Sequence, residues 1–153
     1  MQLALYQPDI PQNLGTLFRL AACMAVDVSL IEPCGFPFDD RKIRRAGMDY
    51  IEHVKLVRHI SWQHFSQSRS QHNRLILLTT KSPVIYTDFT FAPTDILLVG
   101  RESAGVPDEV AVTCDAAITI PMQHPMRSLN VAVAAAMVLG EALRQTENFP
   151  EKQ

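Results

Sequence analysis

The chain of 153 residues is long enough to bury the core of one compact domain and too short for two. Hydrophobic residues make up 47% of it and charged residues 20%, a balance that excludes an intrinsically disordered chain. The formal net charge of -2 gives no overall attraction to nucleic acid, so an RNA partner requires a local basic patch. We expect a single domain over residues 1–153, with a flexible tail from about residue 146.

Five short apolar runs, each bounded by turn residues, predict β-strands. They lie at residues 3–6, 28–32, 74–80, 95–100 and 116–120. Because the runs are apolar on both faces, they are typical of a parallel sheet that helices cover on both sides.

Helical patterns fall between several of these runs. Within residues 13–25, the apolar side chains recur at helical spacing, at Leu14, Leu17, Phe18 and Ala21. Weaker patterns cover residues 61–71 and 107–113. The alternation of strands and helices predicts an α/β domain with one parallel sheet and helices on both faces.

The last predicted helix contains a stretch, residues 131–140, without a charged or strongly polar side chain on any face. Such a helix is buried on several sides, either inside a monomer or against a second subunit. We expect a C2 dimer, because a second subunit gives the remaining apolar face a partner. The stretch is far too short to span a membrane, so we expect no membrane partner.

Three predicted strands end about twenty residues apart, near Thr79, Gly100 and Ile120, and turn-forming residues follow each end. In open parallel sheets, ligands bind beyond the carboxyl ends of strands. We therefore expect these loops to form a pocket; the alternative is that they only connect strands.

Several common sites are missing from the sequence. It lacks a dinucleotide-binding GxGxxG, a phosphate-binding loop, a GxSxG nucleophile elbow and an HExxH zinc motif. The histidines do not stand at metal-ligand spacing, so we expect no metal. The cysteines, Cys23, Cys34 and Cys114, form no CxxC pair, and free thiols fit the cytoplasm. No basic, apolar signal peptide opens the chain, which also favours a cytoplasmic location.

Three ordered segments together resemble one enzyme family. "PDIPQNLGTLFRLAA" at 8–22 contains Asn-x-Gly followed four residues later by Arg; "LLVGRESAGVP" at 97–107 contains Gly-x-Glu-x-x-Gly; "IPMQHPMRSLNVAVAAAMVL" at 120–139 contains Ile-Pro-Met and then Ser-Leu-Asn. This pattern is similar to that of the SPOUT methyltransferases, which methylate RNA with S-adenosylmethionine. Residues 31–50 resemble its minimal YibK/TrmL type, the tRNA (cytidine/uridine-2'-O-)-methyltransferases that act at the wobble nucleotide.

The resemblance implies a C-terminal trefoil knot, a homodimer, and S-adenosyl-L-methionine as the cofactor. It also implies a tRNA partner, bound at the anticodon loop. By resemblance, the cofactor is contacted largely through the backbone at Leu78, Gly100, Ile120, Met122, Ser128 and Leu129. For Gly100 a tight turn is the alternative or additional role. Ser128 is equally suited to cap the helix that follows it.

Arg19 is the residue that we expect to take part in the chemistry, together with Asn130. By helical geometry Arg19 lies about 140° from Leu14, off the apolar stripe, so it is free to reach the pocket of a partner subunit. A guanidinium stays protonated in proteins, so we expect it to stabilise the developing alkoxide rather than to act as a base. A solvated surface arginine is the alternative. Asn130 orients the substrate or cofactor, or supports a helix cap.

The remaining motif residues have expected structural roles. Asn13 and Gly15 are expected to shape the turn before the first helix, with Asn13 alternatively only its N-cap. Glu102 is expected to hold its loop, through hydrogen bonds to backbone or to a partner arginine.

The densest basic cluster is predicted to bind RNA phosphates. Its members are Arg41, Lys42, Arg44 and Arg45. A solvated helix face, with Asp39 and Asp40 as counter-charges, is the alternative. Two other functions stay open from sequence: ribose methylation of ribosomal RNA, and a non-catalytic dimer that binds RNA or cofactor.

Overall fold

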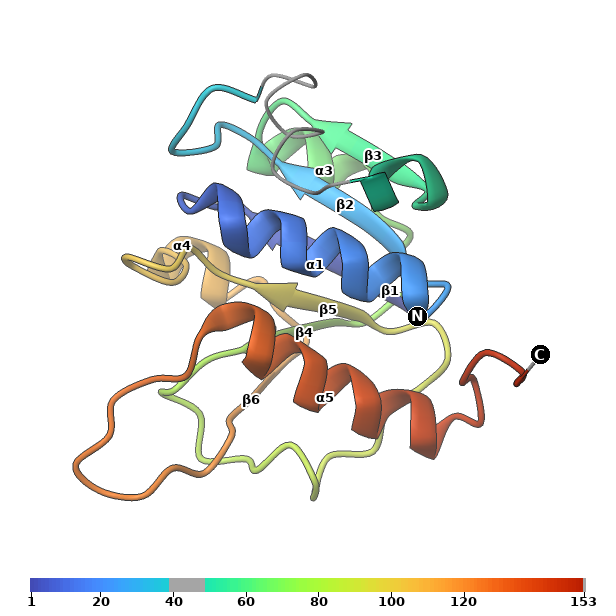
Figure 1. The fold of residues 1–153 in the computed structure, drawn as a ribbon. Helices are drawn as coiled ribbons and strands as arrows, with labels where there is room; N and C mark the ends of the chain where they lie inside the picture. The colour runs from blue at the N-terminus through green and yellow to red at the C-terminus, as the bar shows by residue number, and fades with distance from the viewer. Residues whose placement is uncertain (39–48, 153) are drawn as a thin grey trace.

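The computed structural model describes residues 1–38 and 49–152, which form a six-stranded sheet with all neighbouring strands parallel. The strand order is β3-β2-β1-β5-β4-β6 (Figure 1). The strands are β1 Gln2–Tyr6, β2 Asp27–Ile31, β3 Leu56–His59, β4 Leu75–Leu78, β5 Ile96–Val99 and β6 Ala116–Ile118. Since Val99 of β5 pairs with both Leu5 and Leu78, and Leu78 also pairs with Ile118, four carboxyl ends lie together at one edge.

Helices cover both faces of this sheet, as the sequence predicts. α1 (Pro11–Cys23) and α5 (Val131–Gln145) pack side by side on the face turned to the viewer in Figure 1. α3 (Trp62–Ser68) and α4 (Asp108–Ala111) contribute Phe65 and Val110 to a second core on the opposite face. The short 3-10 helix η1 (Asp49–His53) packs against α1.

The predicted apolar stripe of α1 is confirmed: Leu14, Leu17, Phe18 and Ala21 are all buried. They join Leu3 and Leu97 of the sheet in one core, and each large side chain contributes about 1.5–3 kcal/mol through burial. α1 begins at Pro11 with Ile10 as its N-cap, earlier than the pattern suggested, because proline fits the first turn, where its missing N–H is not needed.

One strand was missed. β3 is the edge strand, and two of its four residues, Val57 and Arg58, are exposed. It therefore lacks the continuous apolar run by which the other strands were recognised.

The apolar helix α5 is buried on one side only. Its buried residues are Ala132, Ala135, Val138, Leu139, Ala142 and Leu143. Val133 and Met137, on the other side, are 51% and 40% exposed, so the alternative of a helix enclosed within one chain is wrong. No helix among the described residues is both long enough and apolar enough to cross a membrane.

The chain leaving β6 runs beside the loop that follows β4. The N–H of Thr119 donates to the carbonyl of Val84 at 2.8 Å, and the N–H of Tyr86 donates to the carbonyl of Thr119 at 2.9 Å. The chain then returns across the sheet edge to α5 (Figure 1). The trefoil knot at this place stays a prediction.

Candidate functional site

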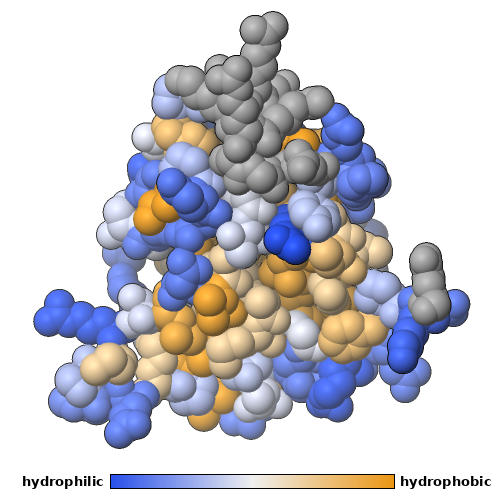
Figure 2. Space-filling model, viewed as in Figure 1, coloured by the Kyte–Doolittle hydropathy of each residue, from blue (hydrophilic) through white to orange (hydrophobic). Residues whose placement is uncertain are grey.

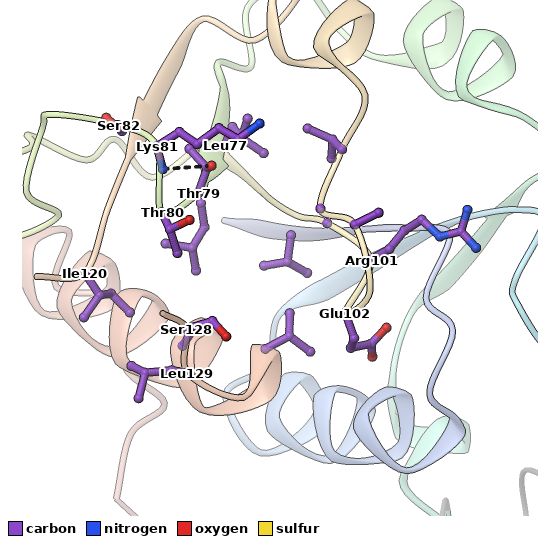
Figure 3. A pocket seen from close by; sticks show the side chains of 18 of the residues that line it. Leu77, Thr79, Thr80, Lys81, Ser82, Arg101, Glu102, Ile120, Ser128 and Leu129 are labelled. Atoms are coloured by element: carbon purple, nitrogen blue, oxygen red, sulfur yellow. Dashed lines mark hydrogen bonds between the residues drawn. The ribbon is translucent and has the colours of Figure 1, made fainter. Parts of the chain in front are cut away.

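The loops after β4, β5 and β6 line one pocket of about 740 Å³ (Figure 3). This volume lies within the ordinary range for small-molecule sites. Loops from distant parts of the sequence meet here because parallel neighbours β5, β4 and β6 end at the same edge. The expected pocket is therefore confirmed, and the alternative of mere connections is wrong.

All six residues that the family resemblance assigned to the cofactor line this pocket. They are Leu78, Gly100, Ile120, Met122, Ser128 and Leu129. In Figure 3, Ser128, Leu129 and Ile120 lie on one side of the cavity, and Thr79 and Thr80 on another. Their individual roles stay predictions, but their common location follows from the fold.

Gly100 opens a tight turn at the end of β5. The N–H of Arg101 donates to the carbonyl of Gly105 at 3.0 Å, and the N–H of Gly105 donates to the carbonyl of Arg101 at 2.8 Å. A Cβ on Gly100 would lie 2.6 Å from the carbonyl carbon of Gly105, and Gly105 itself has φ +66°. The two glycines of the Gly-x-Glu-x-x-Gly segment thus permit this turn, as the alternative role for Gly100 required.

Glu102 connects this turn to the start of α1. Its carboxylate accepts from the N–H of Asp9 at 2.9 Å and from Nδ2 of Asn13 at 3.1 Å. In return, Asp9 accepts from the N–H of Glu102 at 3.2 Å and from the hydroxyl of Ser103. Glu102 therefore holds its loop through backbone and side-chain hydrogen bonds within the chain.

The two carboxylates of this junction have opposite pKa shifts. Hydrogen bonding with Glu102, followed by the Ser103 hydroxyl and the charge of Arg101, lowers the pKa of Asp9 to about 2. Burial, followed by the hydrogen bond with Asp9, raises the pKa of Glu102. Asp9 thus carries the more persistent negative charge of the pair.

Asn130 joins the first and third motifs. Its Nδ2 donates to Oδ1 of Asn13 at 2.9 Å, and its own Oδ1 accepts from the N–H groups of Ala132 and Val133. Asn130, and not Ser128, is therefore the N-cap of α5. The prediction that Asn13 and Gly15 shape the turn before the first helix is also wrong, because both residues lie inside α1. The alternative for Asn13 is wrong too, because the N-cap of α1 is Ile10.

Arg19 does not line the pocket of its own chain. It is exposed, six residues after Asn13, which corresponds to about 9 Å along α1, and its guanidinium lies 5.0 Å from the ring centre of Tyr50. A role in a partner's pocket stays a prediction. The predicted RNA-binding residues Arg41, Lys42, Arg44 and Arg45 lie outside the described residues.

Sequence reasoning missed several pocket residues. Lys81 and Ser82 lie on the loop after β4, where only a turn was recognised. Ile10 and Arg101 lie inside the first and second motif segments, where no role was assigned to them. For Lys81, Ser82 and Arg101, the signal that could have found them is their position just after the end of a predicted strand. Within residues 1–38 and 49–152, no three side chains of His, Cys, Asp or Glu gather in a way that could hold a metal ion.

The family model described as the SpoU rRNA Methylase family matches residues 1–140. The chain belongs to this family. Within the matched range, residues of the three motif segments line one pocket.

Individual relatives and solved structures similar to this SpoU family member are also methyltransferases or concern RNA methylation. A tRNA (cytidine(34)-2'-O)-methyltransferase from Beijerinckia indica is 62% identical over 144 residues, which cover 94% of this chain and 90% of the relative. A solved structure described as giving insights into the 2-OH methylation of C/U34 on tRNA is 40% identical, with a TM-score of 0.87, and the match covers 94% of this chain and 89% of that one. An AdoMet-bound rRNA methyltransferase from Sinorhizobium meliloti is 27% identical, with a TM-score of 0.83, covering 94% of this chain and 55% of that one.

The pocket of this SpoU family member fits S-adenosylmethionine. Apolar side chains such as Leu78, Ile120 and Leu129 provide its walls. The backbone N–H groups of Ser128 and Leu129 donate to no other residue in the described part of the chain, so they are available to a ligand. A small ligand with an adenine edge and a polar tail matches such a lining.

Proposed function

We propose that this chain transfers a methyl group from S-adenosylmethionine to the ribose 2'-hydroxyl of nucleotide 34 of a tRNA, a cytidine or uridine. The observation that carries the proposal is the convergence of three distant motif segments on one pocket. The 62% identical relative with this activity, matched over nearly its whole length, supports the same substrate.

The reaction needs little covalent chemistry from the protein. The cofactor supplies an electrophilic methyl group on its sulfonium. The residues of this chain must hold the two reactants in line and stabilise the charge that develops on the ribose oxygen. Gly100, Ile120, Met122, Ser128 and Leu129 would hold the cofactor, and Asn130, fixed by Asn13, would orient the ribose.

Arg19 of a second copy would complete the site. The apolar side chains Leu129, Val133 and Met137 are all at least 40% exposed. Figure 2 shows hydrophobic surface on the face that α1 and α5 form. Burying this face against a second copy removes apolar area from water and brings an exposed Arg19 to the interface. We therefore propose a homodimer in which Arg19 stabilises the developing alkoxide in its partner's pocket.

The test is incubation of the purified protein with S-adenosylmethionine and tRNA from cells that lack this modification, followed by nucleoside mapping. We expect a methyl group on the ribose of nucleotide 34 only. Methylation of ribosomal RNA but not of tRNA would favour the other activity that the family's description suggests. Binding of cofactor and tRNA without any methylated nucleoside would indicate a non-catalytic dimer.

A further inference from the structure

Arg101 stands at the place where the order of the sheet reverses. It follows β5, whose neighbour β1 is the first strand of the chain; β2 and β3 extend the sheet on one side of this pair, and β4 and β6 on the other. The carboxyl ends of β1 and β5 are adjacent, since Leu5 pairs with Val99. In open α/β sheets, ligands bind beyond the strand ends at such a point.

The guanidinium of Arg101 is poorly satisfied by the protein. One terminal nitrogen donates to Oε1 of Gln7 at 3.5 Å, the upper limit for a hydrogen bond. Nε lies 3.8 Å from Oδ2 of Asp9 and is buried without a hydrogen-bond partner among the described residues. Asp9 is already occupied by the N–H of Glu102 and the hydroxyl of Ser103. Most of the five donors of Arg101 therefore remain available.

The direction of this side chain separates it from the cofactor residues. In Figure 3, Arg101 points away from Ile120, Ser128 and Leu129. Its terminal nitrogen lies 3.8 Å from the place where a Cβ on Gly35 would stand, so the guanidinium reaches the turn around Gly35. The side chain is 35% exposed, and Arg101 is also one of the residues that line the pocket.

We propose that Arg101 binds a backbone phosphate of the RNA substrate next to the methylated ribose. This inference rests on the proposed function. The planar fork of donors matches two phosphate oxygens, and Asp9 holds the guanidinium in place without a close ion pair that would occupy it. A phosphate neighbouring the target ribose thereby fixes that ribose at the pocket.

The experiment measures tRNA binding without cofactor over a series of potassium chloride concentrations. The variants are Arg101→Gln, Arg101→Met and Arg101→Lys. The control is Lys55→Gln, which removes one positive charge that is 75% exposed and paired with Asp27 at the amino ends of the strands. For both neutral variants, we expect weaker binding and a log–log salt slope that is smaller in magnitude by about 0.7, the change for one lost phosphate contact on a single strand.

Arg101→Lys keeps the charge and is expected to keep the slope, and Lys55→Gln is expected to behave as wild type. If Arg101 only ties Gln7 to Asp9, its neutral variants will unfold more easily while the slope stays unchanged, which overturns the inference. Weaker S-adenosylmethionine binding with unchanged tRNA binding also overturns it, since the arginine would then serve the cofactor. Absence of wild-type tRNA binding would contradict the proposed function as well.

Discussion

Asn13 shows how much a single side-chain amide can connect. It donates to Glu102 of the second motif and accepts from Asn130 of the third, although these residues lie 89 and 117 positions away. Glu102 in turn holds the turn at the end of β5, and Asn130 caps α5. Asn13 is therefore expected to set the relative position of three walls of the pocket.

We expect Asn13→Ala to lower the free energy of unfolding by about 1–3 kcal/mol, because the partly buried carboxylate of Glu102 loses one of its donors and Asn130 loses its acceptor. The turnover number should fall more than the affinity for S-adenosylmethionine, since the apolar walls remain. Urea unfolding measures the free energy of unfolding, and steady-state kinetics measure the turnover number and the dependence on S-adenosylmethionine. The control is Gln12→Ala, an exposed neighbour whose backbone carbonyl accepts from the hydroxyl of Thr16, a bond that the substitution leaves in place. Equal behaviour of the two variants would contradict the positioning role.

His59 is a buried histidine on the edge strand. It is 4% exposed, its Nε2 lies 3.1 Å from the hydroxyl of Ser29, and its ring meets Phe65 edge-on. Burial, and then the nearby His64, lowers the pKa of His59. The neutral ring is thus favoured in the folded protein, and the unfolded chain takes up a proton first as the pH falls.

The stability linked to His59 is therefore complete above about pH 6.5 and is lost as the pH falls from there toward the lower pKa of the folded state. We expect the free energy of unfolding of the wild type to decrease over this window. His59→Gln should show a smaller decrease, whereas exposed His72→Gln should match the wild type. Chemical unfolding at a series of pH values checks this, and identical pH profiles for wild type and His59→Gln would show the expectation to be wrong.

At the scale of single residues, the sequence located the pocket better than it assigned roles. Ser-Leu-Asn correctly marked the start of α5, but the cap is Asn130 and not Ser128. Spacing along the chain cannot tell which of two neighbouring polar side chains bonds the helix N–H groups. The partners of Glu102 are similarly hidden, because they come from a segment that only the folded sheet brings near.

At the scale of elements, the turn after β5 depends on the absence of a side chain. A Cβ on Gly100 would come within 3 Å of three backbone atoms of Gly105, so the turn must shift to accept it. We expect Gly100→Ala to weaken S-adenosylmethionine binding at least tenfold, about 1.4 kcal/mol, while the overall fold persists. Isothermal titration calorimetry measures the affinity and circular dichroism the fold. Gly140→Ala is the control, because Gly140 lies outside the pocket and a Cβ added there meets no atom within 4 Å; wild-type affinity in Gly100→Ala would refute the expectation.

Helices and strands with a regular pattern of apolar residues could be predicted from the sequence. Features that depend on neighbouring elements, such as an edge strand, could not. The interior strands are apolar on both faces and were recognised, whereas β3 is an edge strand with exposed Val57 and Arg58. The all-apolar pattern of α5 predicted burial on several sides, but a single chain buries only one. The exposed apolar side chains of α5, Val133 and Met137, are the part of the pattern that one chain does not explain, and they are the basis for proposing a dimer.

At the scale of the whole molecule, Arg19 and the pocket are separate within one chain. Arg19 is exposed on α1 and does not line the cavity. The neighbouring face of α5 leaves Val133 and Met137 in solvent. In a C2 dimer these apolar side chains become buried, and each guanidinium can enter the site of the other subunit. The family pattern suggested this arrangement, and no pattern within one sequence fixes the geometry of two chains.

Subunit mixing distinguishes a role of Arg19 in its own pocket from a role in its partner's. Arg19→Ala is expected to abolish turnover with nearly unchanged cofactor affinity, because the pocket itself stays intact. Gly100→Ala, with a damaged pocket, still carries Arg19. The assay uses an S-adenosylmethionine concentration well below the weakened dissociation constant of Gly100→Ala, so that neither variant alone is active. After co-expression, half of randomly formed dimers are mixed, and each contains one intact pocket facing one intact arginine. The mixture should then regain about a quarter of the wild-type activity in methylating tRNA.

If Arg19 instead acts within its own chain, the mixed dimers contain no complete site and the mixture stays inactive. A double variant that carries both substitutions is the control, because its mixture with Arg19→Ala can never form a complete site in either arrangement. Dilution before the assay supplies the second measurement: as dimers dissociate, the regained activity should fall more steeply than the protein concentration. Activity per chain that stays constant down to the monomeric state would exclude a shared site.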